Sequence, residues 1–431
     1  MTTQHPVRKK QPLQTGQARL GVDLQHEAVL DPTLDFASAM QGPCGETATA
    51  RSVFLTGATG FLGVFLLAEL LQKTEATVYC LVRGADPETA LNRVQSKLVT
   101  NALWNDSYRE RIVPVVGNLA QPLLGLSSQT FDQLAEEIDA IYHNGAVVNF
   151  LQSYRALKAA NVTGTQEIIR LALQHKCKPL HYVSTVFVFE PRQHANGRVC
   201  YETDDLGDGN RLLLGYFQSK WVAEKIIAQA RARGLPAFIY RPGVLIGDSE
   251  TGIWDNPDDF LCRAIKGCIQ LGAWPVLENS VSLAPVNYVG KAIVHLAQRS
   301  TGQGNVFHLV NPHPLAFSQL FEWIESFGYP LERMPLKEWQ TRLKTGVTRP
   351  QDNALALLLP ILAKGHATAE PQTLPDLFEQ GHLPQFDARN TLAGLAGSSI
   401  HCPPLTSEHI RAYLAYFVQS GHLAAAPRVQ V

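Results

Sequence analysis

A glycine-rich segment near residue 60 constrains the fold more than any other part of the sequence. Gly57, Gly60 and Gly63 follow a G-x-x-G-x-x-G spacing between a short apolar run and an amphipathic run. The first run is typical of a buried strand and the second of a helix. In such a unit the glycines permit a tight turn, close approach of a pyrophosphate and close packing of the helix, whose N-terminus offers N–H groups to an anion. The segment predicts a dinucleotide site to which Thr56 and Thr59 would add donors; the alternative is a tight turn without a ligand.

Strand-like and helix-like runs alternate from residue 51 to about residue 250. Amphipathic runs typical of helices separate short, continuous apolar runs. Apolar runs of this kind are typical of strands that are buried on both faces. They lie at 53–55, 78–82, 112–116, 140–143, 180–184 and 237–240. The alternation predicts an α/β fold of the Rossmann type, which is a doubly wound parallel sheet with helices on both faces.

The two ends of the chain have a different pattern. Residues 1–50 are polar and rich in turn-forming residues, so we expect an N-terminal extension or linker that packs at most as one small helix. Beyond about residue 250, helical runs such as 317–327 and 409–419 alternate with loops, which predicts a smaller, mostly helical substrate domain. We therefore expect a dinucleotide-binding domain over 51–250, with 283–311 returning to it, and a substrate domain over 251–282 and 312–431.

Composition excludes several classes of protein. The formal net charge of the 431-residue chain is -1, so no basic excess is available for binding nucleic acid. Every apolar run is shorter than about 18 residues, and we expect neither a membrane span nor a secretory signal. The seven cysteines include no C-x-x-C pair, and the fourteen histidines include no H-x-x-x-H spacing. We therefore expect no metal site and no disulfide framework, as is usual in the reducing cytoplasm.

The end of the second predicted strand indicates the type of dinucleotide. An acidic residue there would accept a hydrogen bond from a ribose 2′-OH, whereas an arginine would pair with a 2′-phosphate. The chain has Arg83 at this position and no acidic residue before Asp86. Arg93 lies about one helix length further on and would fold back as a second cation. The alternative for each arginine is a solvated surface residue, and the pattern favours NADP(H).

Tyr216 and Lys220 form a Y-x-x-x-K pair on one face of a predicted helix. Reduction of a carbonyl group needs a proton on oxygen as well as a hydride on carbon. The pKa of a free tyrosine is near 10, and we expect the neighbouring ammonium to lower it toward the working range. The alternative is a surface pair without a function.

Two further residues are candidates for the same site. Thr185 follows the predicted strand at 180–184, where its hydroxyl would hydrogen-bond the substrate oxygen alongside Tyr216. We prefer Thr185 to Ser184, because alternate residues of a strand point to opposite faces. Asn161 would hold a water that relays protons toward Lys220; an asparagine that only packs its helix is the alternative.

Together these residues resemble the extended short-chain dehydrogenase/reductases and, more narrowly, the thioester reductase domains. Those domains terminate non-ribosomal peptide synthetases, some polyketide synthases and carboxylic acid reductases. The resemblance covers nearly the whole chain, and its main motifs are VFLTGATGFLG, CLVRGADPETALNRV, IYHNGAVVNFLQSYRALKAANVTGTQEI, HYVSTVFVF, GYFQSKWVAEK, YRPGVLIGDSETG and PVNYVGKAIVHL. The LKAANV-x-GT and DSETG-like stretches are specific to this branch.

The resemblance implies an activity and a set of residues. The activity is NADPH-dependent reduction of an acyl or peptidyl thioester, held on the phosphopantetheine arm of a carrier protein, to an aldehyde and in a second round to the alcohol. Thr185, Tyr216 and Lys220 would be catalytic, and the last two would also contact the cofactor. The other implied cofactor-binding residues are Gly57, Thr59, Gly60, Phe61, Leu62, Gly63, Arg83, Arg93, Leu119, Gly145, Ala146, Val147, Pro242 and Gly243. Asn118 stands where the family commonly has Asp, so we expect altered adenine contacts with binding retained.

Other functions fit part of the same pattern. A fatty acyl-CoA reductase, or another extended dehydrogenase or epimerase, would share every cofactor residue. A non-catalytic NADP-binding sensor typically loses the Tyr/Lys pair, which this chain keeps. A free-standing enzyme and a terminal domain suit the pattern equally.

Overall fold

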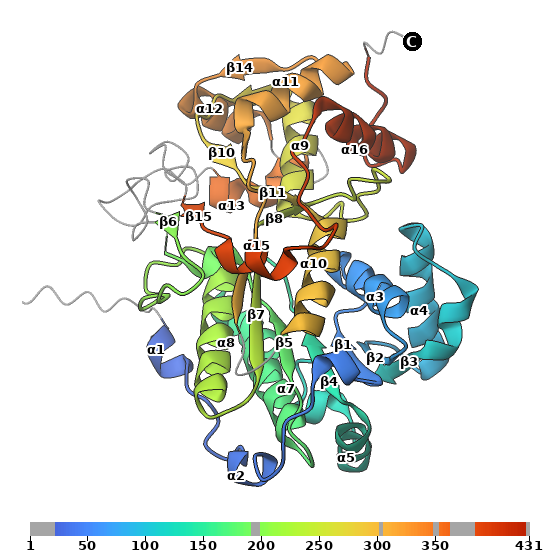
Figure 1. Ribbon diagram of the computed structural model, residues 1–431. Coiled ribbons are helices and arrows are strands. Elements are labelled where there is room, and N and C mark those ends of the chain that lie inside the picture. The colour runs from blue at the N-terminus through green and yellow to red at the C-terminus, as the bar shows by residue number, and fades with distance from the viewer. Residues whose placement is uncertain (1–21, 191–198, 301–304, 348–352, 363–383, 428–431) are drawn as a thin grey trace, which may run out of the picture.

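The computed structural model describes residues 22–190, 199–300, 305–347, 353–362 and 384–427 (Figure 1). Its centre is a seven-stranded sheet in the order β12-β7-β5-β4-β1-β2-β3, in which every adjacent pair is parallel. The strands are β1 (Ser52–Thr56), β2 (Thr77–Val82), β3 (Ile112–Val116), β4 (Ala140–His143), β5 (Leu180–Val183), β7 (Ala237–Pro242) and β12 (Val306–Leu309). The order reverses between β1 and β4, which is where open α/β sheets bind ligands. The expected Rossmann-type sheet is confirmed.

Helices cover both faces of the sheet, because successive side chains of each strand point to opposite sides. Phe54 and Tyr182 belong to a core shared with α5, α7 and α8, whereas Leu55 and Tyr142 belong to a core shared with α3, α4 and α10. These helices are α3 (Phe61–Lys73), α4 (Pro87–Thr100), α5 (Ser128–Glu137), α6 (Tyr154–Lys158), α7 (Gly164–Leu173), α8 (Gly215–Ala232) and α10 (Val286–Arg299). A π-helical turn at Ala159–Thr163 joins α6 to α7.

A second unit with its own hydrophobic core lies above the sheet in Figure 1. Its helices are α9 (Phe260–Leu271), α11 (Phe317–Phe327), α12 (Leu336–Gly346), the 3-10 helix η7 (Ala354–Leu358), α13 (Leu359–Leu362) and α16 (Ser407–Gln419). Two small sheets accompany them, formed by β9 (Ala273–Pro275) with β14 (Glu332–Met334) and by β10 (Ser280–Val281) with β13 (Leu315–Ala316). The unit is therefore mainly helical.

The last part of the chain contacts both units. The expected division assigns all of 312–431 to the substrate domain, yet α15 (Arg389–Leu395) packs against α10 and β12 (Figure 1). The buried Glu202 carboxylate fixes this contact by accepting hydrogen bonds from the backbone N–H groups of Asn390 and Thr391. A further pair, β6 (Val199–Cys200) with β15 (Gln385–Phe386), joins the last part of the chain to the first unit. The pair β8 (Val244–Ile246) with β11 (Leu283–Pro285) lies within 51–250 and the returning segment 283–311.

The N-terminal segment is more ordered than the sequence suggests. From residue 22 it forms two short helices, α1 (Leu24–Glu27) and α2 (Phe36–Ala39), instead of one. Its backbone is fixed by the side chain of Gln229 on α8, which accepts from the Leu30 N–H and donates to the Ala28 carbonyl. Residues 22–50 therefore pack as part of the dinucleotide-binding unit, and residues 1–21 of the expected extension lie outside the described residues.

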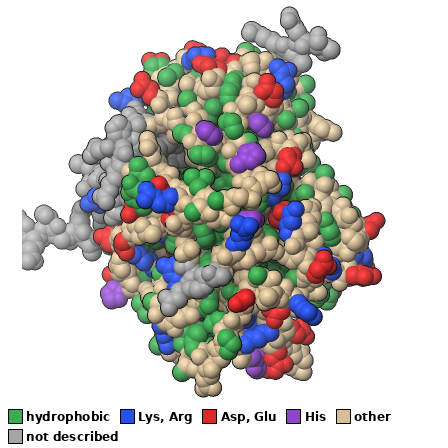
Figure 2. Space-filling view, viewed as in Figure 1, with side chains coloured by type: hydrophobic (Ala, Val, Ile, Leu, Met, Phe, Trp, Pro, Cys, Tyr) green, Lys and Arg blue, Asp and Glu red, His purple; other side chains and the backbone are tan. Residues whose placement is uncertain are grey.

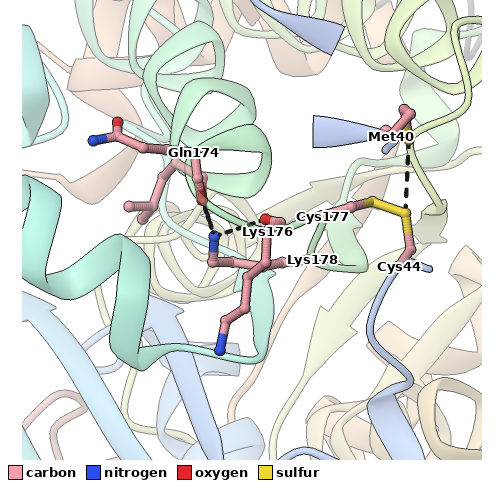
Figure 3. The surroundings of a disulfide bond; sticks show 7 residues. Met40, Cys44, Gln174, Lys176, Cys177 and Lys178 are labelled. Atoms are coloured by element: carbon pink, nitrogen blue, oxygen red, sulfur yellow. Dashed lines mark hydrogen bonds between the residues drawn. A yellow bond between two sulfur atoms is a disulfide. The ribbon is translucent and has the colours of Figure 1, made fainter. Parts of the chain in front are cut away.

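A disulfide bond between Cys44 and Cys177 attaches the same segment to the end of α7 (Figure 3). The absence of C-x-x-C pairs had argued against disulfides, but the two cysteines are 133 positions apart and meet only in the folded chain, with their Cα atoms 4.6 Å apart. The cysteine argument for a reducing cytoplasm is weakened accordingly. Cys80, Cys200, Cys262, Cys268 and Cys402 are not disulfide-bonded and are buried.

The outer surface mixes charges of both signs. Figure 2 shows acidic and basic side chains interspersed over the visible face, in keeping with the net charge of -1. Within the described ranges, none of the helices has the length and apolar character needed to cross a bilayer.

Candidate active site

The glycine turn between β1 and α3 is built for close approach. Gly57 has a φ of +76°, and a Cβ atom added there would lie 2.8 Å from the Gly145 Cα atom. A Cβ atom on Gly63 would lie 1.8 Å from the Gly57 carbonyl oxygen, so Gly63 serves the packing of α3 on β1. Gly60 is the N-cap of α3 and no side chain caps this helix, which leaves its first N–H groups available to an anion. The turn fits a pyrophosphate.

The two arginines meet at the carboxyl end of β2. Arg93, on α4, reaches back and donates a hydrogen bond from Nη1 to the Arg83 carbonyl oxygen. Both side chains are exposed, and both line the same cavity as the glycine turn. Guanidinium groups stay charged at any physiological pH, so the residues present fit the extra phosphate of NADP.

Thr56 does not act as a donor to this site. It is fully buried, and its Oγ1 atom lies 2.8 Å from His143 Nδ1 and accepts a hydrogen bond from the Gly145 N–H. Burial lowers the pKa of His143 to about 3, with a further contribution from the Lys220 charge. Thr56 and the neutral His143 therefore fix the start of the loop that follows β4. Of the two threonines beside the glycine turn, Thr59 lines the cavity.

Asn161 anchors this loop to α8. Its Oδ1 atom accepts from the Val147 N–H at 2.7 Å, and its Nδ2 atom donates to the Val147 carbonyl and to Ser219 Oγ. Because both amide hydrogens have protein partners and Asn161 does not line the cavity, these contacts favour the packing alternative over the proton relay. The π-helical turn that contains Asn161 gives this side chain its direction.

Tyr216 and Lys220 both line the cavity from α8. Lys220 Nζ donates to the Val183 carbonyl at 2.6 Å and lies 4.1 Å from the centre of the Tyr182 ring. Burial lowers the pKa of Lys220 to about 7, although the nearby Glu224 charge opposes the shift. Burial raises the pKa of Tyr216, and the Lys220 ammonium is not among the causes of its shift. The expected lowering of the tyrosine pKa is therefore wrong for this arrangement, because loss of solvation dominates.

The hydroxyls of Ser184 and Thr185 both lie at the cavity. Strand β5 ends at Val183, so the alternation of faces that excluded Ser184 no longer applies there. Thr185 Oγ1 accepts from the Phe187 N–H at 3.3 Å and donates to the Pro242 carbonyl at 3.5 Å. Ser184 Oγ is buried and has no hydrogen-bond partner among the described residues. The site therefore offers two hydroxyls, of which Ser184 is the less engaged.

The remaining predicted residues converge on the same cavity. Asn118, Leu119, Gly145, Ala146, Val147, Pro242 and Gly243 all line it, as do Thr59, Gly60, Phe61 and Leu62. Of the predicted residues, Thr56, Gly63 and Asn161 do not. Asn118 Oδ1 accepts from the Ala120 N–H, so part of its polar capacity serves its own turn.

The sequence did not reveal an aromatic cluster around Tyr216. The Phe150 ring lies 5.7 Å from the Tyr216 ring, 5.9 Å from Phe217 and 5.8 Å from Phe260, and Phe187 stacks on Phe217 at 5.1 Å. Phe187 and Phe217 are adjacent to motif residues, which is a usable signal. Phe150 also lies within a motif, in the loop after β4, whereas Phe260 comes from α9 of the second unit and no local pattern marks it.

The cavity has a volume of about 1650 Å³ and extends from the glycine turn to α12 of the second unit. Sites for a single small molecule typically have about 300–1,000 Å³. The space is therefore large enough for a dinucleotide and a second ligand together, with Tyr216 and Lys220 on its wall.

A parallel dinucleotide fold with a Tyr-x-x-x-Lys pair and a strand-end hydroxyl defines an oxidoreductase of the extended short-chain dehydrogenase/reductase class that uses a nicotinamide cofactor. Within that class, the chain belongs to the family described as "Male sterility protein", whose model matches residues 55–293. It is also similar to the terminal R domain of the myxalamid PKS-NRPS pathway, with 40% identity and a TM-score of 0.84, over 93% of this chain and 98% of that one.

Curated relatives extend the same likeness. The chain is 41% identical to a component of the linear gramicidin synthase of Brevibacillus parabrevis and 36% identical to isonitrile lipopeptide synthase of Streptomyces coeruleorubidus, in each case over 93% of its length. It spans 8% and 26% of those two proteins, respectively.

Proposed function

We propose that the chain is an NADPH-dependent thioester reductase. In this proposal it releases an acyl or peptidyl group as an aldehyde from the phosphopantetheine arm of a carrier protein. The observation that carries the proposal is a single cavity that joins the glycine turn, the Tyr216–Lys220 pair and the interior of the second unit. The likeness to linear gramicidin synthase, to isonitrile lipopeptide synthase and to the myxalamid R domain supports a substrate bound as a thioester.

NADPH is the proposed cofactor because two cations, Arg83 and Arg93, lie beside the end of β2. The glycine turn would hold the pyrophosphate, and Asn118 with Leu119 would lie by the adenine. Gly145, Ala146, Val147, Pro242 and Gly243 would surround the nicotinamide half. When bound, the cofactor supplies the hydride. Lys220, whose ammonium is held against the Val183 carbonyl, would fix the ribose.

Tyr216 and Thr185 would hydrogen-bond the thioester oxygen. Burial raises the pKa of Tyr216, so its hydroxyl stays protonated at neutral pH and donates to the negative charge that develops on this oxygen. Addition of hydride and a proton gives a thiohemiacetal. Its collapse breaks the carbon–sulfur bond and leaves an aldehyde and a free pantetheine thiol. The net change is a two-electron reduction, and a second cycle on the aldehyde would give the alcohol.

The test removes the phenol and keeps the ring. Tyr216→Phe should lower kcat at least about 100-fold, since a positioned proton donor typically contributes a factor of about 10²–10⁴. NADPH binding, measured by fluorescence titration, should change little. Tyr201→Phe is the matched control, because Tyr201 is exposed and does not line the cavity.

Substrate comparison separates the proposal from its rivals. Wild-type protein would be offered an acyl-pantetheine thioester on a carrier protein, an acyl-CoA and a nucleotide sugar, with loss of NADPH absorbance as the readout. The carrier-bound thioester should be reduced with the highest kcat/KM. Preference for acyl-CoA would indicate a fatty acyl-CoA reductase, and NADPH binding without turnover of any substrate would indicate a sensor.

A further inference from the structure

The Lys220 ammonium lies in a buried setting with little hydrogen bonding to compensate for the loss of water. The side chain is 3% exposed, and among the described residues Nζ donates to one group, the Val183 carbonyl at 2.6 Å. An ammonium that leaves water without further compensation tends to lose its proton. Other groups must therefore favour the charged form if Lys220 is to act as a cation.

The face of the Tyr182 ring lies directly against this ammonium. The Lys220 Nζ atom is 4.1 Å from the ring centre, well inside the distance of about 6 Å at which the face of an aromatic ring attracts a cation. Tyr182 is fully buried on β5, in the core that this strand shares with α8, so the ring is fixed in place. The attraction is strongest where water is excluded. The ring therefore replaces part of the solvation that the ammonium loses.

The Glu224 carboxylate lies one helical turn beyond Lys220, on the same face of α8. It is 2% exposed, and Arg241 on β7 donates to its Oε1 atom from both Nε and Nη2. The second oxygen, Oε2, is buried and has no hydrogen-bond partner among the described residues. Part of the negative charge is therefore left to act on neighbouring groups, and it opposes the lowering of the Lys220 pKa by burial.

The Tyr182 hydroxyl is not the part of the side chain that serves Lys220. It is buried and has no hydrogen-bond partner among the described residues. Burial raises the pKa of Tyr182, and the nearby Glu224 charge adds to the shift, so the phenol stays neutral. The contact with the ammonium is made by the face of the ring, which a phenylalanine would keep.

The other titratable groups around Lys220 do not favour its charge. His143 on β4 is buried, which lowers its pKa to about 3 and leaves it neutral. Tyr216, one turn earlier on α8, keeps its proton because burial raises its pKa. Arg241 is itself a cation and is engaged with the carboxylate on α8. The segment after β4, residues 144–150, has no titratable side chain. The ring and the carboxylate therefore carry the compensation.

We propose that Tyr182 and Glu224 are positioning residues that hold Lys220 as an ammonium against the Val183 carbonyl, the first through the face of its ring and the second through its charge. This inference rests on the proposed function, in which the cationic Lys220 fixes the cofactor ribose. Neither Tyr182 nor Glu224 lines the cavity, so both act through Lys220, which does. Because the carbonyl and the ring engage one side of the ammonium, its remaining N–H is left for the ribose.

The pH dependence of turnover tests the ring. Activity that needs the Lys220 ammonium falls as the pH rises through the pKa of Lys220. Tyr182→Leu should move this fall in kcat/KM for an acyl-pantetheine thioester toward lower pH by about one unit, the size expected for a desolvated cation–π contact. Tyr182→Phe keeps the ring and should keep the wild-type profile. An unchanged profile in Tyr182→Leu, or an equal shift in Tyr182→Phe, would overturn the role of the ring.

A second buried tyrosine provides the matched control. Tyr142 lies on β4 in the core on the other face of the sheet and is 1% exposed. Tyr142→Leu loses the same volume as Tyr182→Leu and should lower the stability without moving the pH profile. If Tyr182→Leu does not fold, Tyr182→Met, which fills more of the space, replaces it with the same expected shift.

Removal of the carboxylate charge tests Glu224. Glu224→Gln keeps the shape of the side chain and should move the fall in kcat/KM toward lower pH by about one to two units. Because this variant leaves Arg241 buried without its partner, a second variant combines it with Arg241→Met; replacing both charges of a buried pair is better tolerated than removing one. The double variant should show a smaller shift in the same direction, since the opposing Arg241 charge is also removed. A wild-type profile in either variant that folds would refute the role of Glu224.

A stability measurement without substrate or cofactor keeps the inference separate from turnover. Urea unfolding at pH 5, 6, 7 and 8 compares wild type and Tyr182→Leu, each with and without Lys220→Met. For wild type the effect of Lys220→Met should stop changing below about pH 7, where the folded and unfolded chains both bind the Lys220 proton. In Tyr182→Leu this limit should move to about pH 6. A moved limit without reduction of any thioester would uphold the inference and refute the proposed function, whereas turnover with an unmoved limit would refute the inference alone.

Discussion

Replacement of Lys220 by methionine should make the stability of the protein respond differently to pH. Burial lowers the pKa of Lys220 from 10.5 to about 7, because the ammonium has left water and has one carbonyl as its hydrogen-bond partner. Below about pH 7 the folded and unfolded chains both bind this proton, and above about pH 10.5 neither does. Between these limits only the unfolded chain binds it. A state that binds more protons is favoured as the pH falls, so wild type loses stability as the pH falls from about 10.5 to about 7.

The free energy of unfolding of wild type therefore rises as the pH rises through this window. Each pH unit between about 7 and 10 should add about 1.4 kcal/mol to the free energy of unfolding of wild type relative to Lys220→Met, and the whole window about 4 kcal/mol. The variant also leaves the Val183 carbonyl without its donor, which costs about 1–3 kcal/mol at every pH and does not change the slope. Most other titrating groups are common to both proteins and cancel in the difference.

Urea unfolding of both proteins at pH 7, 8, 9 and 10 measures the slope. Lys225→Met is the matched control on the same helix, because Lys225 pairs with the exposed Asp205 carboxylate. Its difference from wild type should vary much less with pH. A Lys220→Met difference that stays constant from pH 7 to 10 would refute the claim that the folded chain holds this lysine with a lowered pKa.

Three further predictions concern the cofactor site and its supports. Arg83→Ala should raise the KM for NADPH about tenfold or more and leave the KM for NADH nearly unchanged, since only NADPH carries the phosphate that the guanidinium would pair with. Steady-state kinetics with both cofactors measures the two KM values, and equal changes in both would contradict the prediction. Asn161→Ala removes three hydrogen bonds at the Val147 loop and should lower the free energy of unfolding by about 1–3 kcal/mol, measured by urea unfolding. It should also weaken cofactor binding, measured by titration, and an unchanged cofactor affinity would show that Asn161 is not needed to hold the loop. Cys44→Ser opens the Cys44–Cys177 link, should lower the free energy of unfolding by about 2–4 kcal/mol, and should make the stability insensitive to reductant.

Much of the dinucleotide-binding unit could be predicted from the sequence. Parallel strands buried on both faces appear as continuous apolar runs, and six of the seven strands of the sheet coincide with such runs. The glycine turn, Tyr216 and Lys220 were found because each depends on a local spacing. In the second unit, the amphipathic run at 317–327 matches α11 from its first residue to its last.

Features that depend on distant residues could not be predicted in this way. The hydrogen bond between Thr56 and His143 joins residues 87 positions apart that no single motif contains. Val147 and Asn161 lie within one motif, but its spacing does not show that their groups meet. The direction of the Tyr216 pKa shift depends on how completely the second unit and the loop after β4 exclude water, and a Y-x-x-x-K spacing carries no information about that.

The hydrogen bonds that attach α15 to the sheet have a practical consequence for chimeric enzymes. An exchange of the substrate unit at residue 312 would also replace α15 and uncover Leu296 and Phe307. Gly394 of α15 packs closely on these residues, and a Cβ atom added at Gly394 would lie 2.3 Å from Leu296. The exchange would also leave the buried Glu202 carboxylate beside a foreign helix in place of α15, from whose N–H groups it accepts hydrogen bonds. A recipient scaffold should therefore retain its own residues 385–402 and accept foreign sequence only on either side of them.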